Sequence, residues 1–246
     1  MRPAVVIPTF NESDNLAALI ADLHTHTPDL TTIIVDDNSP DGTGELAKVL
    51  ASRDRRIHTI HRPRKLGLGT AHIAGIKWAL SQNMDPILTM DADFSHSPRY
   101  VPALLRALGT FDTVIGSRYI PGGGSLHCTL PRMALSRSAN AFARSMLGLK
   151  ANDCTAGFRA YRPVVLDSID LEAIVSDGYS FLIEMLYHCQ KGGWRIGEVP
   201  IIFEDRRHGK SKVSRQEVLK ALNTVFRLRM ASGRLPRPSV RRRTAP

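Results

Sequence analysis

The chain has 246 residues, of which 43% are hydrophobic and 23% charged, and its formal net charge at pH 7 is +10. This length and composition are ordinary for a soluble globular protein of one large or two small domains, and no apolar run approaches the roughly 18–20 residues of a membrane-spanning helix. The three cysteines show no CxxC spacing, which argues against a disulfide framework and a cysteine zinc site, so we expect small buried side chains at all three.

Short apolar runs alternate with amphipathic helical patterns through the first half of the chain. The apolar runs predict strands at residues 4–8, 31–39, 57–62, 86–93 and 112–119. The helical patterns predict helices at residues 11–26, 41–53, 68–82 and 97–108. Strands separated by helices in this way are typical of βαβ units, so the sequence predicts an α/β fold with a mostly parallel sheet.

The alternation loosens after the PGGG turn at residues 121–124. Further helices are predicted at residues 131–148, 179–193 and 214–230, and a further strand at 198–203. The helix at 214–230 is basic and amphipathic, and the basic stretch 231–246 is expected to be disordered.

Three of the predicted strands end in polar or acidic residues, in the segments AVVIPTFNE, IIVDDNSPD and ILTMDAD. Ligands of open α/β sheets bind outside the carboxyl ends of the strands. We therefore expect these three strand ends to line one crevice.

Asp91 and Asp93 stand one residue apart at the end of the predicted strand 86–93. On an extended segment such residues point to the same side, so both carboxylates could face one hard cation such as Mg²⁺ or Mn²⁺. A solvated turn is the alternative, and the other acidic strand ends favour the metal. Nearby His96 is more typical of a solvated loop residue.

The segment VDDNSPDGT combines a strand end with strong turn chemistry. The turn explains Asp41 without a functional role. Asp37 is open between the turn and a role in hydrogen-bonding a base or a ribose. Glu12, in the first strand end, could simply serve the positive N-terminus of the following helix.

Arg118 follows a fourth strand, so we expect it to face the same crevice. Arg132 and Ser136 are four residues apart near a helix start, an arrangement suited to holding a phosphate dianion. Glu184 lies among apolar residues of its helix, where it is either exposed or unusually paired.

The positive charge of the chain is concentrated at its C-terminal end, where residues 206–246 hold 13 Lys and Arg against one acid. The segment DRRHGKSK at 205–212 could form a mobile lid that stabilises a departing pyrophosphate. The tail could meet the anionic face of a membrane or a phosphorylated substrate. Nucleic acid is disfavoured as a partner because the rest of the chain is not basic.

Taken together, these segments resemble family 2 glycosyltransferases, and within them the polyprenol-phosphate (dolichol-phosphate) mannose synthases. The matching segments, in order over about residues 3–213, are PTFNE.DN, VDDNSPDGT, RKLGLGTA..AG, MDADFSH.P, GSRY..GGG, R…S..AN, D.TAGFRAY, GYSF..E and EVPI.F.DR..GKSK. The resemblance implies a GT-A fold, which is Rossmann-like and has a mostly parallel central sheet flanked by helices. Phe10 departs from the Tyr usual in the family, and Cys128 from a frequent Trp.

The resemblance also implies roles for residues of this chain. The residues that would bind GDP-mannose are Pro8, Phe10, Glu12, Asp37, Asp91, Ala92, Arg206 and Lys212. Those that would hold the acceptor phosphate are Arg118, Arg132 and Ser136. Asp93 and Ser95 would coordinate Mg²⁺ or Mn²⁺, and Asp91, Asp93 and Arg118 would be catalytic.

The implied reaction is transfer of mannose, with inversion, from GDP-mannose to a polyprenyl or dolichyl monophosphate. Because that acceptor is already anionic, positioning and charge neutralisation suffice, and no general base is required. A family 2 enzyme that uses another sugar nucleotide, such as UDP-glucose, is the nearest alternative. A sugar nucleotidyltransferase and a basic-tailed adaptor for phospholipid or RNA are less favoured.

We accordingly expect a catalytic domain at residues 1–213, a basic helix at 214–230 and a disordered tail at 231–246. The opening segment MRPAVVIPTFNE does not have the pattern of a signal peptide. The expected location is cytoplasmic and peripheral to the membrane, through the basic C-terminus or a membrane-anchored partner protein.

Overall fold

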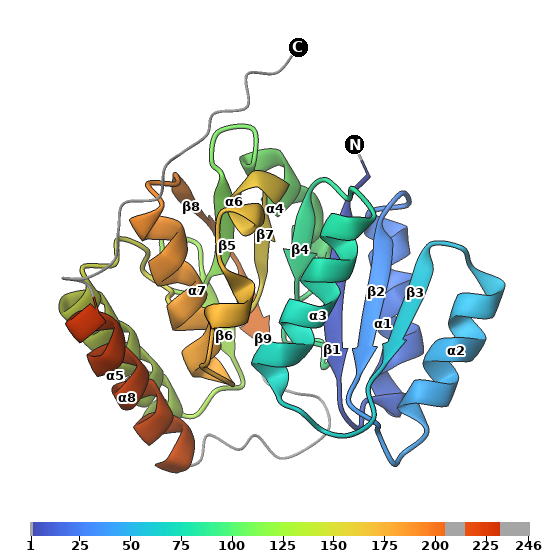
Figure 1. Ribbon diagram of the computed structural model, residues 1–246, viewed down its shortest axis with the longest axis horizontal. Coiled ribbons are helices and arrows are strands. Elements are labelled where there is room, and N and C mark those ends of the chain that lie inside the picture. Colours follow the sequence, from blue (N-terminus) through green and yellow to red (C-terminus); the bar gives the residue numbers. More distant parts are fainter. Residues whose placement is uncertain (1, 205–214, 232–246) are drawn as a thin grey trace.

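The computed structural model describes residues 2–204 and 215–231, and a seven-stranded sheet forms its centre, in the order β3-β2-β1-β4-β7-β5-β8 (Figure 1). Its strands are β1 (Ala4–Thr9), β2 (Thr31–Asp36), β3 (Ile57–His61), β4 (Ile87–Thr89), β5 (Thr113–Ser117), β7 (Arg159–Tyr161) and β8 (Ile196–Pro200). β7 runs antiparallel to both of its neighbours, β4 and β5, whereas the other neighbouring strands pair in parallel. The predicted α/β fold with a mostly parallel sheet is therefore confirmed.

Helices cover both faces of this sheet (Figure 1). They are α1 (Ser13–His26), α2 (Thr43–Arg53), α3 (Leu68–Ser81), α4 (Val101–Ala107), α5 (Leu130–Leu147), α6 (Pro163–Asp167), α7 (Tyr179–Lys191) and α8 (Arg215–Ala231). Short 3₁₀ turns lie at η1 (Pro98–Tyr100) and η2 (Leu171–Ala173). None of the described helices is both long and apolar enough to cross a membrane.

The alternating side chains of β1 show how the strands divide the core. Val5 and Ile7 join one apolar cluster with residues of α1 and α4, whereas Ala4 and Val6 join another with α3, α6 and α7. Successive side chains of a strand point to opposite faces of a sheet, so a strand covered on both faces is apolar throughout. This is why β1 and β2 were recognisable as uninterrupted apolar runs.

The predicted strand 198–203 is wrong as a single element, because it divides at Ile201. β8 ends at Pro200, and β9 (Ile202–Glu204) pairs with β6 (Gly124–Leu126) in a separate two-stranded sheet. Between them the backbone of Ile201 donates to Ser117 and accepts from Gly124, so this residue bridges the two sheets. The division places β9 beside the ends of β4 and β5.

The predicted strand 86–93 is also too long, since β4 ends at Thr89. The chain then bends, and Phe94 has a positive φ of 62°. Asp91 and Asp93 therefore lie beyond the strand, so the prediction that they point to the same side loses the extended segment on which it was based.

Candidate active site

The carboxyl ends of β1 and β2 are linked by hydrogen bonds to the buried carboxylate of Asp36. Asp36 accepts hydrogen bonds from the hydroxyls of Thr9 at 3.0 Å and Ser39 at 2.5 Å, and from the Ser39 amide at 3.1 Å. Asp36 thus fixes the first two strand ends and has a structural role.

Asp37 is buried as well, and it organises the loop between β3 and α3. Its carboxylate forms an ion pair with Arg62 at 2.5 Å and accepts from the amides of Leu66 and Gly67 at 3.0 and 3.1 Å. Gly67 has a φ of +102°, which glycine adopts without strain. Asp37 therefore positions a glycine loop beside the carboxyl end of β2, and its contact with a nucleotide stays a prediction.

The remaining residues of the first strand end lie around that loop. The Lys65 ammonium stands 3.8 Å from the centroid of the Phe10 ring, and Pro8 and Phe10 are both half-buried. Glu12 is the N-cap residue of α1, but its side chain makes no capping hydrogen bond to the helix backbone and instead accepts from the side-chain amide of Asn15 at 2.8 Å, so its service to the helix N-terminus stays a prediction.

The turn assignment of Asp41 is confirmed. Its carboxylate accepts from the backbone amides of Ser13 and Thr43 at 3.1 and 3.0 Å and from the Thr43 hydroxyl at 2.6 Å. Burial alone would raise the pKa of Asp41, but these hydrogen bonds outweigh it and lower the pKa below its ordinary value.

The two acids of ILTMDADFSH occupy different environments. Asp91 keeps 34% of its side chain exposed, whereas Asp93 is buried and accepts from the amide of Ser95 at 3.0 Å. His96 is buried too, which corrects its assignment to a solvated loop. Because the chain turns back at Phe94, the Asp91 amide donates to Nδ1 of His96 at 3.0 Å, so this nitrogen is an acceptor.

Asp93 and Ser95 have the chemistry of a hard-cation site. The Ser95 hydroxyl oxygen is buried and has no hydrogen-bond partner among the described residues. A buried hydroxyl without a partner is costly, and coordination to a cation would satisfy it. The described part of the chain contains no group of three or more acidic, His or Cys side chains that could hold a metal. Mg²⁺ is usually bound by one or two carboxylates together with substrate phosphates and water.

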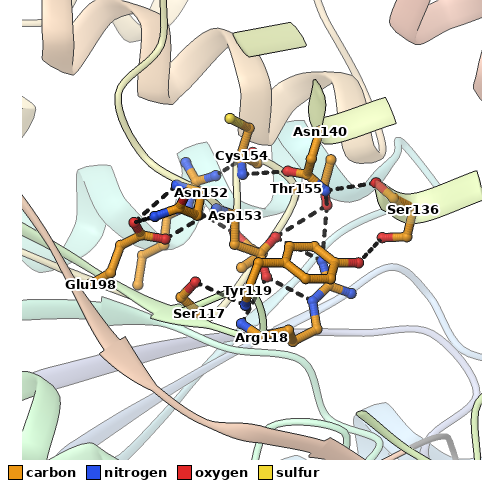
Figure 2. A network of polar contacts seen from close by, with 12 residues as sticks. Ser117, Arg118, Tyr119, Ser136, Asn140, Asn152, Asp153, Cys154, Thr155 and Glu198 are labelled. Atoms are coloured by element: carbon orange, nitrogen blue, oxygen red, sulfur yellow. Dashed lines mark hydrogen bonds and ion pairs between the residues drawn. The ribbon is translucent and has the colours of Figure 1, made fainter. Parts of the chain in front are cut away.

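Arg118 is held at the end of β5 by a buried acid that the sequence analysis did not single out. Figure 2 shows Asp153 accepting from Nε and Nη2 of Arg118 at 2.7 and 2.8 Å, while Nη2 also donates to Thr155 at 2.9 Å. Burial would raise the pKa of Asp153, but the hydrogen bonds and charge of Arg118 outweigh it and lower the pKa. The pair fixes the guanidinium and leaves Nη1 without a partner within the described residues.

The same polar network continues onto α5 (Figure 2). The Ser136 hydroxyl accepts from Tyr119 at 2.7 Å, and Asn140 donates to Thr155 at 3.1 Å. Arg132, half-buried, lies one turn before Ser136 on this helix. The structure thus links Ser136 to Tyr119, the residue after Arg118, and the joint role of Ser136 and Arg118 that the resemblance implies stays a prediction.

The segment 153–157 links this network to the acidic strand ends. Its Gly157 carbonyl accepts from the Thr89 hydroxyl at 2.8 Å, and a Cβ on Gly157 would stand 3.5 Å from the Asp91 carboxylate. Phe203 of β9 lies between the two halves, 5.2 Å from the Arg118 guanidinium and 5.8 Å from the His96 ring. Arg118 and the DAD segment therefore border one site.

Some residues of this site could be expected from the sequence and others could not. Asp153 belongs to the segment D.TAGFRAY, in which an acid stands among apolar residues. Nothing in the local sequence predicted that Phe203 would lie at this site, because its position depends on the break between β8 and β9. The predicted ligands Arg206 and Lys212 lie outside the described residues.

Comparison with known proteins places this geometry in a family. Residues 4–170 match the family model "Glycosyl transferase family 2". The chain is 44% identical over 232 residues to undecaprenyl-phosphate mannosyltransferase of Micrococcus luteus, covering 94% of this chain and 96% of the relative. It is 43% identical over 226 residues to polyprenol monophosphomannose synthase of Mycolicibacterium smegmatis, covering 91% and 85%.

A solved structure supports the same fold. Glucosyl-3-phosphoglycerate synthase of Mycobacterium tuberculosis, in complex with Mn²⁺, UDP and glucosyl-3-phosphoglycerate, matches with a TM-score of 0.64 at 20% identity. The match covers 92% of this chain and 79% of the other, and confirms the GT-A fold. By the family match and the two close relatives, the chain belongs to glycosyl transferase family 2.

Proposed function

We propose that the protein is an inverting, metal-dependent mannosyltransferase. It transfers mannose from GDP-mannose to a polyprenyl monophosphate and releases GDP. The observation that carries the proposal is the identity of 44% and 43%, over nearly the whole chain, to two relatives named for polyprenyl-phosphate mannose synthesis. Both names specify mannose, so a UDP-glucose-dependent enzyme is not favoured.

The donor would lie over the ends of β1, β2 and β4. The glycine loop held by Asp37 borders this region, and Pro8, Phe10 and Glu12 stand at the first strand end. Asp91, the more exposed of the two DAD acids, and Ala92 would face the sugar nucleotide. Bound between Asp93 and the donor diphosphate, Mg²⁺ or Mn²⁺ would neutralise the charge of the leaving group.

The acceptor phosphate would lie against Arg118, Arg132 and Ser136. Asp153 holds Arg118 through Nε and Nη2, so Nη1 is the part of this guanidinium that can turn to a phosphate. A phosphate oxygen forms the new bond to the anomeric carbon of mannose as its bond to the GDP oxygen breaks. The attacking oxygen carries no proton in the ionised acceptor, so positioning rather than base catalysis drives the step.

The lipid substrate requires work at a membrane surface. We propose peripheral attachment at the cytoplasmic face, through the basic C-terminal region or a membrane-anchored partner, because basic segments are attracted to anionic lipids. The predicted lid residues Arg206 and Lys212 would clamp the diphosphate.

The test is a transfer assay with the purified full-length chain, radiolabelled GDP-mannose and a short polyprenyl phosphate, with and without EDTA. EDTA should abolish transfer and added Mg²⁺ or Mn²⁺ should restore it. Asp93→Asn should lower the rate by about 100-fold or more, since it removes the metal carboxylate. Asp14→Asn, at an exposed position of α1, is the matched control and should retain activity. Full metal-dependent transfer by Asp93→Asn, or transfer from UDP-glucose alone, would overturn the proposal.

A further inference from the structure

An open cavity of about 340 Å³ lies between α5 and the segment 118–123 that follows β5. Arg137 and Arg144 line it from α5, Arg118 borders it from the other side, and two asparagines, Asn140 and Asn152, contribute polar surface. None of the described residues that line the cavity is acidic. Its walls are therefore strongly cationic.

Arg137 and Arg144, which line the cavity, lie on a different flank of α5 from Arg132 and Ser136, and the lining residue Asn140 lies between the two flanks. At about 100° of rotation per residue, Arg137 and Arg144 stand two turns apart on one flank of the helix, whereas Ser136 points about 100° away from Arg137. On the far flank Phe142 contacts Phe226 of α8, with 6.1 Å between ring centroids. The cavity therefore adjoins the acceptor cluster: it shares Arg118 with that cluster, and two other lining residues, Tyr119 and Asn140, donate to Ser136, whereas Arg137 and Arg144 are not part of the cluster.

Two acids lie near this cavity without lining it. Asp153 is paired with Arg118, and Glu198 accepts from the neutral side-chain amide of Asn152 at 2.9 Å, so neither is paired with Arg137 or Arg144. Arg137 and Arg144 are exposed, and within the part of the chain that the structure describes neither forms an ion pair. The nearest aromatic contact of Arg137 is the Tyr119 ring, 6.0 Å from its guanidinium.

We propose that this cavity is a second anion site, which binds a phosphate group between Arg137 and Arg144. Guanidinium groups present forked N–H donors that match phosphate oxygens, and two of them on one helix flank can share one phosphate. The cavity has room for the group to which the phosphate is attached. Both the headgroup of an anionic phospholipid and a soluble phosphate carry this chemistry.

The primary test uses the full-length chain and the double variant Arg137→Gln/Arg144→Gln. The matched control is Arg53→Gln/Arg106→Gln, which removes the same charge at exposed positions on α2 and α4. The probes are inorganic phosphate, followed by ³¹P NMR titration, and vesicles of phosphatidylcholine with and without phosphatidylglycerol. We expect the double variant to bind inorganic phosphate, phosphatidylglycerol vesicles or both more weakly than the control does, by a factor of about five or more.

The probe that responds identifies the source of the phosphate. Weaker binding of the phosphatidylglycerol vesicles assigns the site to a lipid headgroup, and weaker binding of inorganic phosphate alone assigns it to a soluble phosphate. Equal binding of both probes by the double variant and its control would overturn the proposal.

A second pair of variants tests the cavity without removing an arginine. Ala141→Glu places a carboxylate among the lining residues, where it would compete with phosphate for the guanidinium groups. Ala134→Glu, one exposed alanine for another on the same helix, is its control because Ala134 does not line the cavity. Ala141→Glu should weaken binding of the responsive probe and Ala134→Glu should not, and equal binding by the two would contradict the site.

Discussion

His72 is a fully buried histidine on α3 whose ring stacks on Phe181, with 5.6 Å between ring centroids and 4° between planes. Neither ring nitrogen has a hydrogen-bond partner among the described residues. Burial, together with the positive charge of Arg159 on β7, lowers the pKa of His72 from 6.5 to about 3. The side chain is therefore neutral in the folded protein throughout the physiological range.

This burial predicts a specific pH dependence of stability. Between pH 6.5 and about 3 the unfolded chain binds a proton at His72 that the folded chain does not. The free energy of unfolding should therefore fall as the pH drops below 6.5, by up to about 1.4 kcal/mol for each pH unit from this residue. His72→Leu should flatten that decline and, by removing the unpaired nitrogens, add about 1–2 kcal/mol at neutral pH.

Urea unfolding at a series of pH values between about 4 and 7 measures this effect. His72→Gln is the control, because it does not titrate but keeps unpaired polar atoms in the core. It should flatten the pH dependence without the gain at neutral pH. An unchanged slope in both variants would show that His72 does not govern the decline.

At the scale of elements, the docking of α8 on α7 depends on a buried carboxylate. The side chain of Glu184 is 1% exposed and accepts from Arg227 of α8 at 2.8 Å and from the Ser176 amide at 3.2 Å. Burial would raise the pKa of Glu184, but the nearby His188 and the hydrogen bonds from Arg227 and Ser176 outweigh it and lower the pKa to about 2. Glu184 is thus paired, one of the two outcomes left open by the sequence.

Arg227→Met should destabilise the protein by about 1–3 kcal/mol, because it leaves the buried Glu184 carboxylate without its cation. The contribution of Glu184 is full above its ordinary pKa of 4.5 and is lost as the pH falls toward 2. The difference between wild type and Arg227→Met should therefore shrink as the pH falls below about 4.5. Thermal or urea unfolding at neutral and acid pH checks both statements, with Arg53→Met on α2 as an exposed control. A difference that grows in acid would contradict this account.

Elements of five residues or more were largely predictable, since their apolar runs or helical periods are long enough to read. β6 and β7, of three residues each, were missed because so short a segment has no period of its own. The positions of these two strands are set by pairing with distant segments. β7 pairs with β4 and β5 in the main sheet, and β6 pairs with β9, which follows the break in the strand at Ile201. The error at β4 has the same origin, since nothing local distinguishes its last residue, Thr89, from the bend that follows.

In the candidate site, too, some residues could be predicted from the local sequence, whereas others depend on contacts between distant segments. Asp93 and Arg118 were candidates because they follow predicted strand ends, and Ser95 was a candidate only through the family resemblance. The ion pair of Arg118 with Asp153 joins residues 35 positions apart, and the contact of Phe203 with His96 requires β9 to leave the main sheet. Such partners are set by tertiary structure and carry no local pattern.

In the whole molecule, α8 packs into the core instead of standing apart from it. Val225 and Leu228 are buried in an apolar cluster with residues of α5 and α7, among them Leu147 and Leu186. Figure 1 shows α5 and α8 side by side at one end of the sheet. The basic C-terminal region therefore includes a helix that contributes to the fold.

Two truncations separate the structural role of α8 from membrane attachment by the tail. A chain that ends after residue 231 loses five arginines but keeps α8, so its Tm should stay within about 2 °C of the full chain, while its binding to anionic vesicles falls by about tenfold or more. A chain that ends after residue 213 loses Val225, Leu228 and the partner of Glu184, so its Tm should fall by about 10 °C or more. Vesicle flotation and thermal unfolding measure the two effects. Undiminished flotation of the first chain would exclude the tail as the membrane contact, and an unchanged Tm of the second would show that residues 1–213 fold without α8.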